Sequence, residues 1–226
     1  MTIWQLIDMK TILTGIDTIQ SDNCSKIKGK RVALLCHAAS YDKKFVHIID
    51  RFHNVFDLRA IFTPQHGLWG HTQANMIEWN GISLHPKYKI PVHSLYGRHR
   101  KPTPEMLENI DILIIDLFDV GARYYTYIWT AALCMEACAQ SNIEIIVLDR
   151  PNPIGGEMIE GPVLSQNLSS FVGLYPLPIR HGMTIGEIML YLNKEFSVNA
   201  SLEIIKMHGY SRELWFDQTD LIWFMP

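Results

Sequence analysis

The segment Asp111–Phe118, DILIIDLF, is apolar at almost every position. A short and nearly continuous apolar run is typical of a strand that is covered on both faces. The segments Arg31–Cys36 (RVALLC) and Ile143–Leu148 (IEIIVL) have the same character. Strands of this kind occur in parallel sheets that are flanked by helices. The sequence therefore predicts an α/β fold, a Rossmann-like three-layer domain with a mainly parallel sheet.

Further strands and helices alternate with these three segments. Additional strands are expected at Phe56–Phe62, Val92–Tyr96 and Leu202–Met207. Helices are expected at Tyr41–Phe52, from Thr103-Pro104-Glu105 onward, at Tyr127–Gln140 and at Thr184–Phe196, where Thr184 and Glu187 fit a capping box. The stretches His66–Pro91 and Arg150–Gly182 are expected to be irregular, and loops of that length usually carry function.

The composition bounds the class of protein. The chain has 226 residues, of which 48% are hydrophobic and 19% charged, which excludes an intrinsically disordered chain. Its net charge is −3, so nothing favours binding to nucleic acid. No apolar run reaches the ~18 residues of a membrane span, and the first residues lack the pattern of a secretory signal. The chain as written is therefore expected to be cytoplasmic, and the sequence indicates no oligomeric state.

The sequence also argues against a metal or a nucleotide cofactor. The four cysteines match no zinc-binding or redox spacing, and the histidines show no ligand spacing. The strand at Arg31–Cys36 is followed by His37-Ala38-Ala39-Ser40, which is not a glycine-rich dinucleotide motif, and no Walker pattern occurs. We therefore expect no cofactor and disfavour a nucleotide-dependent α/β enzyme.

The candidate site residues follow the expected strands, because ligands of open α/β sheets bind beyond the carboxyl ends of the strands. The residues that we single out on this ground are Gln65 and His66, then Asp119, Arg123 and Tyr125, then Arg150 and Asn152, and finally Arg180 and His181 before the last helix. Structural alternatives exist for several of them. Asp119 and Arg123 can form a salt bridge that fixes the next helix, and the segment around Asn152 can be a self-bonded turn.

These segments together resemble the NamZ-type exo-β-N-acetylmuramidase family, which is YbbC-like and was formerly a domain of unknown function. The matching segments are Leu13–Asp17, Gly29–Val32, Pro64–Gly70, Ser94–Gly97, Lys101–Glu105, Asp119–Tyr127, Leu148–Gly156, Glu160–Pro162 and Phe171–Glu187. The resemblance implies a Rossmann-like N-terminal catalytic domain over residues 1–226, followed in the family by a smaller C-terminal domain that is missing from this chain. It leaves a secreted or periplasmic location open.

The resemblance implies a glycoside hydrolase of cell-wall turnover or recycling, which releases N-acetylmuramic acid from the non-reducing ends of peptidoglycan fragments. The partner is then a peptidoglycan-derived sugar. Residues His66 and Asp119 are the expected acid/base or water-positioning groups, with Glu78 in reserve. Sugar binding is expected from Gln65, Arg123, Tyr125, Arg150, Asn152, Arg180 and His181. An arginine suits the lactyl carboxylate of muramic acid, which it can bind bidentately.

One position departs from the family pattern. Many members read Pro-Glu-His-Gly where this chain reads Pro64-Gln65-His66-Gly67, and a glutamine cannot transfer a proton. Glycoside hydrolysis normally needs two carboxyl groups, so a carboxyl would have to come from Glu78, Asp116, Asp119 or Glu160. The alternative reading is a non-catalytic protein that binds amino sugars or muropeptides.

Overall fold

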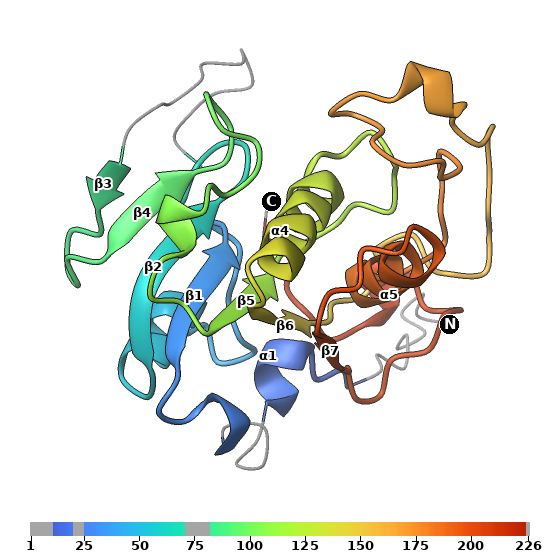
Figure 1. The fold of residues 1–226 in the computed structure, drawn as a ribbon. Helices are drawn as coiled ribbons and strands as arrows, with labels where there is room; N and C mark the ends of the chain where they lie inside the picture. The colour runs from blue at the N-terminus through green and yellow to red at the C-terminus, as the bar shows by residue number, and fades with distance from the viewer. Residues whose placement is uncertain (1–10, 20–24, 71–81, 225–226) are drawn as a thin grey trace, which may run out of the picture.

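The computed structural model describes residues 11–19, 25–70 and 82–224, which form one seven-stranded sheet with helices on both sides (Figure 1). The strands are β1 (Arg31–Cys36), β2 (Asp57–Thr63), β3 (Ile82–Leu84), β4 (Pro91–Ser94), β5 (Ile112–Asp116), β6 (Glu144–Leu148) and β7 (Leu202–Ile205). Their order in the sheet is β3-β4-β2-β1-β5-β6-β7. All neighbours pair in parallel except β3, which pairs antiparallel with β4 at one edge.

The order of the six parallel strands is that of a Rossmann-type sheet, in which the chain winds outward in both directions from β1. The chain first proceeds from β1 to β2 and β4, and it then returns to place β5 on the other side of β1. The carboxyl ends of β1 and β5 therefore meet at the topological switch point, where α/β sheets bind ligands.

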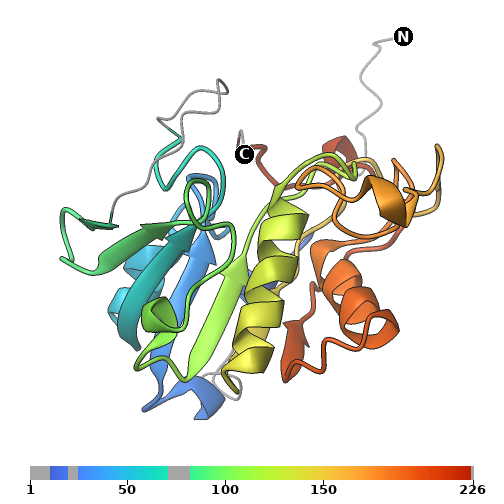
Figure 2. The same cartoon turned by 45° about the horizontal axis from the view of Figure 1, so that its top comes forward.

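Alternate residues of the central strands point to opposite faces of the sheet, and this builds the three layers. One face packs against α4 (Tyr127–Gln140) and α5 (Ile185–Glu195), which Figures 1 and 2 place on the same side of the sheet. That face buries Ala33, Leu35, Leu113, Ile115, Ile145 and Val147. The other face packs against α1 (Gly15–Thr18) and α3 (Ile48–His53), and it buries Val32, Leu34, Ile112, Ile114, Ile146 and Leu148. The predicted three-layer α/β fold is confirmed.

The helix predicted at Tyr41–Phe52 is wrong in its first half, because α3 begins only at Ile48. The carboxylate of Asp42 accepts hydrogen bonds from the backbone N–H groups of Lys44 and Val46, which closes a turn. Phe45 has a φ of 61° and is 56% exposed, so it does not belong to a buried helix face. His47 then caps α3 by accepting from Ile49 N through Nδ1. Side-chain hydrogen bonds thus override the helical spacing of the apolar residues.

The remaining differences between the predicted and the observed helices and strands concern their ends and a few short elements. The helix expected from Thr103 is only a single 3₁₀ turn, Glu105–Leu107, and β3 lies within the stretch that was predicted to be irregular. The stretch from 150 to 182 is irregular as predicted, apart from the 3₁₀ turn Gln166–Leu168. Another 3₁₀ turn, Phe216–Gln218, lies near the C-terminal end. Within the parts of the chain that the structure describes, no helix is long and apolar enough to cross a bilayer.

Candidate active site

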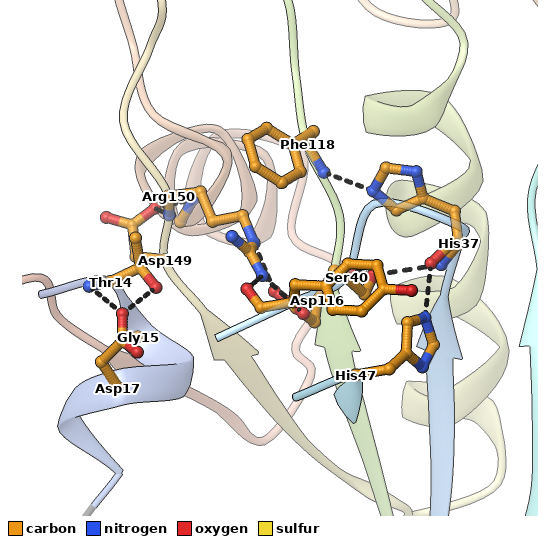
Figure 3. Close-up of polar contacts among 12 residues, drawn as sticks. Thr14, Gly15, Asp17, His37, Ser40, His47, Asp116, Phe118, Asp149 and Arg150 are labelled. Atoms are coloured by element: carbon orange, nitrogen blue, oxygen red, sulfur yellow. Dashed lines mark hydrogen bonds and ion pairs between the residues drawn. The ribbon is translucent and has the colours of Figure 1, made fainter. Parts of the chain in front are cut away.

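The candidate active site lies at the carboxyl ends of β1, β2, β5 and β6, on both sides of the switch point. His37 follows β1, Gln65 follows β2 and Arg150 follows β6, while Asp116 is the last residue of β5 and Asp119 lies three positions beyond it. Figure 3 shows how several of these side chains converge between the strand ends.

A buried ion pair forms the floor of the site. Asp116 is fully buried and Arg150 is 4% exposed. The guanidinium donates to both carboxylate oxygens, with Nε 2.5 Å from Oδ1 and Nη2 2.8 Å from Oδ2 (Figure 3). It also donates to the carbonyl of Tyr41 and lies over the ring of Phe118, 4.4 Å from its centroid. Such a bidentate pair fixes the ends of β5 and β6 relative to each other.

A cavity of about 230 Å³ opens beside this ion pair. Arg150, the rings of Tyr41 and Phe118, and residues of the C-terminal segment 220–224 are among its walls. Phe224 stacks on Tyr41 at a centroid distance of 4.9 Å, and Trp223 meets the edge of Phe118. The cavity exceeds the ~150 Å³ that holds a benzene ring, so it can admit a single ring.

His37 connects the end of β1 with the end of β5. Its Nε2 accepts the backbone N–H of Phe118 at 3.2 Å, so in the neutral ring the proton is on Nδ1 (Figure 3). Burial, with Arg150 and His47 nearby, holds the pKa of His37 well below its ordinary value. His37 is therefore neutral at physiological pH and holds the backbone of β5 in place. Its ring also contacts Tyr127 at a centroid distance of 5.1 Å.

The loop after β2 contacts the loop that precedes α4. Thr126 donates from its hydroxyl to Oε1 of Gln65 at 3.1 Å, and the Tyr127 hydroxyl donates to the Gln65 carbonyl at 3.1 Å. His66 and Gly67 both have a φ of 72°, which turns the chain sharply at this point. Gln65 and His66 are half-buried, so both are placed at the surface of the site.

Asp119 and His181 form a buried polar pair beside these loops, and the half-buried Tyr125 lies close enough to Asp119 to feel its charge. Asp119 Oδ2 accepts from Gly121 N at 3.0 Å and lies 3.1 Å from Nε2 of His181, a contact that lacks hydrogen-bond alignment. His181 Nδ1 accepts from Met183 N, so the neutral ring carries its proton on Nε2, toward Asp119. Burial, together with Tyr127 and Asp119, holds the pKa of Tyr125 well above its ordinary value, so Tyr125 is a neutral hydroxyl.

Three atoms of these three residues have no hydrogen-bond partner among the described residues. They are Asp119 Oδ1, His181 Nε2 and Tyr125 Oη. A buried polar group without a partner costs ~1–3 kcal/mol, and folded proteins contain few of them. These atoms can exchange hydrogen bonds with a bound ligand or with water at the carboxyl edge of the sheet.

Comparison with known proteins identifies the family. A sequence model described as the N-terminal part of the exo-β-N-acetylmuramidase NamZ matches residues 32–226. The chain belongs to the NamZ family. It is 46% identical over 217 residues to a Bacillus subtilis protein named peptidoglycan β-N-acetylmuramidase NamZ, covering 95% of this chain and 52% of the relative. The chain thus spans about half the length of this curated relative.

Two crystal structures of proteins from Bacteroides fragilis, both described as DUF1343 family proteins, share the fold of this NamZ-family chain. One superposes with a TM-score of 0.86 at 41% identity and covers 94% of this chain and 54% of its own. The other has a TM-score of 0.77 at 32% identity and covers 90% of this chain and 54% of its own. The α/β architecture is therefore shared with experimentally solved relatives.

Four of the predicted sugar-binding side chains are engaged within the NamZ-family fold itself. Arg123 donates to the carbonyls of Pro162 and Leu177 rather than forming the alternative salt bridge with Asp119. Asn152 donates to Met183 O and accepts from Ile154 N, as the self-bonded turn requires. The remaining two pair with acids, Arg180 with Glu160 and Arg150 with Asp116. Their roles toward a sugar stay predictions.

The four acids proposed from the sequence differ sharply in their surroundings. Asp116 is held in the ion pair with Arg150, and Glu160 has a side chain that is 56% exposed and binds Arg180. Glu78 lies outside the described residues. Asp119 combines burial with a carboxylate oxygen that has no partner in the described part of the chain. Among these acids, Asp119 therefore fits a role in catalysis best.

Sequence reasoning missed His37, Tyr41, Thr126 and Tyr127 as members of the site. His37 directly follows the strand at Arg31–Cys36, so its position after a buried strand was a usable signal. Tyr41 and Tyr127 each lie at the start of an expected helix, a position that does not reveal that they reach the edge of the sheet. The order of the strands brings these residues to the site: His37 contacts Phe118 after β5, and Thr126 and Tyr127 contact Gln65 after β2.

Asp149 at the end of β6 gives a prediction for stability. Its carboxylate accepts from Arg150 N, Gly186 N and the hydroxyl of Thr184, the N-cap of α5, whose capping box with Glu187 is confirmed. Burial outweighs these hydrogen bonds and raises the pKa of Asp149 to about 6. The folded protein therefore binds the proton of the Asp149 carboxyl group more tightly than the unfolded chain does. Protonated Asp149 stabilises the fold fully below about pH 4, and this contribution is lost as the pH rises through about 6.

We expect Asp149→Asn to remove this pH dependence. Between pH 4 and pH 7, the free energy of unfolding of the wild type should fall by about 2–3 kcal/mol relative to that of the variant. Urea titrations at both pH values measure the difference, and other titrating groups cancel because both proteins contain them. Parallel pH profiles for the two proteins would contradict the assignment.

Proposed function

We propose that this protein hydrolyses the β-glycosidic bond of a terminal N-acetylmuramic acid in peptidoglycan fragments. The proposal rests on membership of the NamZ family together with one geometric observation. Asp119, a buried carboxylate with an unpartnered oxygen, lies with His181 and Tyr125 at the carboxyl edge of the sheet. A carboxyl group at that place can exchange a proton with a glycosidic oxygen or a water molecule.

The surrounding residues supply the other requirements of glycoside hydrolysis. Tyr125 is a neutral hydroxyl donor, and Gln65 offers an amide that can bind a sugar hydroxyl or acetamido group. The cavity beside Arg150 has aromatic walls on which a pyranose ring can pack. Gln65 cannot itself act as an acid or a base, so we expect turnover to be slow.

The direct test is release of N-acetylmuramic acid from its β-1,4-linked disaccharide with N-acetylglucosamine. The reaction is followed by chromatography over hours, with the Asp119→Asn variant as the control. Release by the wild type and loss of release in the variant would support the proposal. Release that is unchanged in Asp119→Asn would show that another group carries the chemistry.

The alternative, a protein that binds muropeptides without cutting them, is favoured by Gln65 alone. Calorimetric binding of the disaccharide without detectable release would establish it. Absence of both binding and release would contradict a role in muramic acid metabolism altogether.

A further inference from the structure

Thr126 is the N-cap residue of α4, but its side chain does not cap the helix. Its hydroxyl accepts no hydrogen bond from the first turn. Thr184, the N-cap of α5, shows the usual arrangement, because its hydroxyl accepts from Glu187 N at 3.2 Å. A threonine at the N-cap normally stabilises its helix through such a bond. The hydroxyl of Thr126 therefore makes a different contact at the cost of the cap.

The hydroxyl of Thr126 contacts the side chain of Gln65, in the loop after β2. It donates to Gln65 Oε1 at 3.1 Å, and the next residue, Tyr127, donates from its own hydroxyl to the Gln65 carbonyl at 3.1 Å. Thr126 and Tyr127 are both buried. The start of α4 thus holds Gln65 at two points, one on its side chain and one on its backbone.

The contact with Thr126 determines which way the amide group of Gln65 is turned. The Thr126 hydroxyl has a single proton, and Gln65 Oε1 is the acceptor that the described residues place within hydrogen-bond distance of it. With the amide turned over, Nε2 would face the hydroxyl, and the Thr126 proton would lose this acceptor. A buried donor without an acceptor is unfavourable. The hydroxyl therefore favours the orientation in which Oε1 faces Thr126 and Nε2 is turned away from it.

The amide nitrogen of Gln65 can be reached by a ligand. Gln65 is half-buried, and within the described ranges its Nε2 donates to no protein group and is not closed off from solvent. An amide nitrogen carries two N–H donors and no acceptor. Gln65 thus presents a group that only donates hydrogen bonds, at the carboxyl edge of the sheet.

The backbone on both sides of Gln65 is also held in place. Thr63 O accepts from Leu95 N at 2.8 Å, and Pro64 O accepts from Gly67 N at 3.2 Å. Together with the contacts from α4, these bonds fix the position of the amide before a ligand arrives. A ligand that accepts from it therefore costs the protein little conformational entropy.

We propose that Thr126 is a positioning residue, which turns the amide of Gln65 so that its NH₂ group donates to a carbonyl-type oxygen on the sugar. This inference rests on the proposed function and specifies how N-acetylmuramic acid is recognised. Two substituents of this sugar carry such an oxygen, the acetamido group at C2 and the lactyl carboxylate at C3. Both oxygens are stronger acceptors than a sugar hydroxyl, so the NH₂ group selects muramic acid over an unsubstituted hexose.

Thr130 provides a matched control one turn further along α4. It is fully buried, and its hydroxyl donates to Thr126 O at 3.2 Å rather than to Gln65. Thr130→Val therefore removes a hydroxyl from the same helix without touching the amide. Thr126→Ser keeps the hydroxyl, and Gln65→Leu removes the amide and so shows whether Thr126 acts through it.

The experiment measures dissociation constants by calorimetry for three methyl β-glycosides. The first is that of N-acetylmuramic acid, the second has a hydroxyl in place of its acetamido group, and the third is that of N-acetylglucosamine, which lacks the lactyl group. We expect Thr126→Val to bind the first roughly fivefold more weakly than the wild type, the contribution of one neutral hydrogen bond. We expect this loss to disappear for one of the other two, the ligand without the substituent that Gln65 binds.

The control variants test whether the effect passes through Gln65. Thr126→Ser and Thr130→Val should bind all three ligands within about twofold of the wild type. In the Gln65→Leu background, Thr126→Val should have no further effect, because the two substitutions remove the same interaction. An equal loss for all three ligands in Thr126→Val, or the same loss in the Gln65→Leu background, would overturn the positioning role.

The outcomes separate this inference from the proposed function. Hydrolysis of the disaccharide together with unaltered affinities in Thr126→Val would overturn the positioning role alone. The expected pattern of affinities without hydrolysis would support the positioning role and contradict the hydrolase. Absence of binding of all three glycosides to the wild type would overturn the positioning role whether or not the disaccharide is hydrolysed.

Discussion

Gln65→Glu is expected to accelerate the release of N-acetylmuramic acid roughly 100- to 10,000-fold, the usual contribution of a positioned general acid or base. The substitution keeps the length of the side chain and replaces an amide that cannot transfer a proton by a carboxyl group. The Thr126 hydroxyl, which now donates to Gln65 Oε1 at 3.1 Å, can donate equally to a glutamate oxygen. The new carboxyl group would therefore enter the place of the old amide without rearrangement of the loop.

Initial rates on the disaccharide measure this effect, with Gln166→Glu as the matched control. Gln166 is exposed on the 3₁₀ turn Gln166–Leu168, so its substitution changes the net charge equally but lies on a separate loop. We expect the control to match the wild type. A Gln65→Glu variant no faster than the wild type would indicate that a carboxyl group at this position is not the source of the proton.

Arg150→Ala is expected to lower the free energy of unfolding by roughly 3–5 kcal/mol, because it leaves a buried carboxylate without its partner. Asp116 is fully buried, and both of its oxygens accept from the guanidinium of Arg150. The variant also loses the contact with Phe118 and the hydrogen bond to Tyr41 O. Urea unfolding followed by tryptophan fluorescence measures the loss.

Two further variants test whether the unpaired charge of Asp116 is the cause of this loss of stability. Adding Asp116→Asn to Arg150→Ala removes the stranded charge, so the double variant should recover at least about 1 kcal/mol of the loss. Arg31→Ala breaks the ion pair with Asp111, whose side chains are 39% and 34% exposed, and should cost at most about 1 kcal/mol. An equal loss in Arg150→Ala and Arg31→Ala would show that the Asp116–Arg150 pair is not buried from solvent.

The layered fold could be predicted because the sequence patterns that indicate it each span only a few neighbouring residues. The run Ile112–Asp116 and its neighbours β1 and β6 are apolar on both faces, and this pattern indicates a covered parallel strand before any contact is known. The capping box of Thr184 and Glu187 likewise spans only four positions of the chain. The predicted helix over 41–52 was wrong in its first half because hydrogen bonds that the side chains of Asp42 and His47 accept from backbone N–H groups outweighed the apolar spacing.

Short stretches of sequence predict only part of the candidate site. Residues such as Gln65, Asp119 and Arg150 could be found because each follows a strand, and parallel strands bring their carboxyl ends to one edge of a sheet. The partners of these residues could not be found in this way. Asp116 and Arg150 are 34 residues apart, and Gln65 and Thr126 are 61 apart, so their contacts depend on strand order and register.

Side-chain chemistry thus set the class of fold and the edge of the sheet at which ligands bind. Whether a given arginine is available for a substrate, or is already bound to a carbonyl or a carboxylate, depended on the folded chain, as Arg123 and Arg150 demonstrate. The physical reason is that apolar periodicity acts over a few residues, whereas a hydrogen bond or an ion pair depends on distances of about 3 Å between atoms that only the folded chain brings together.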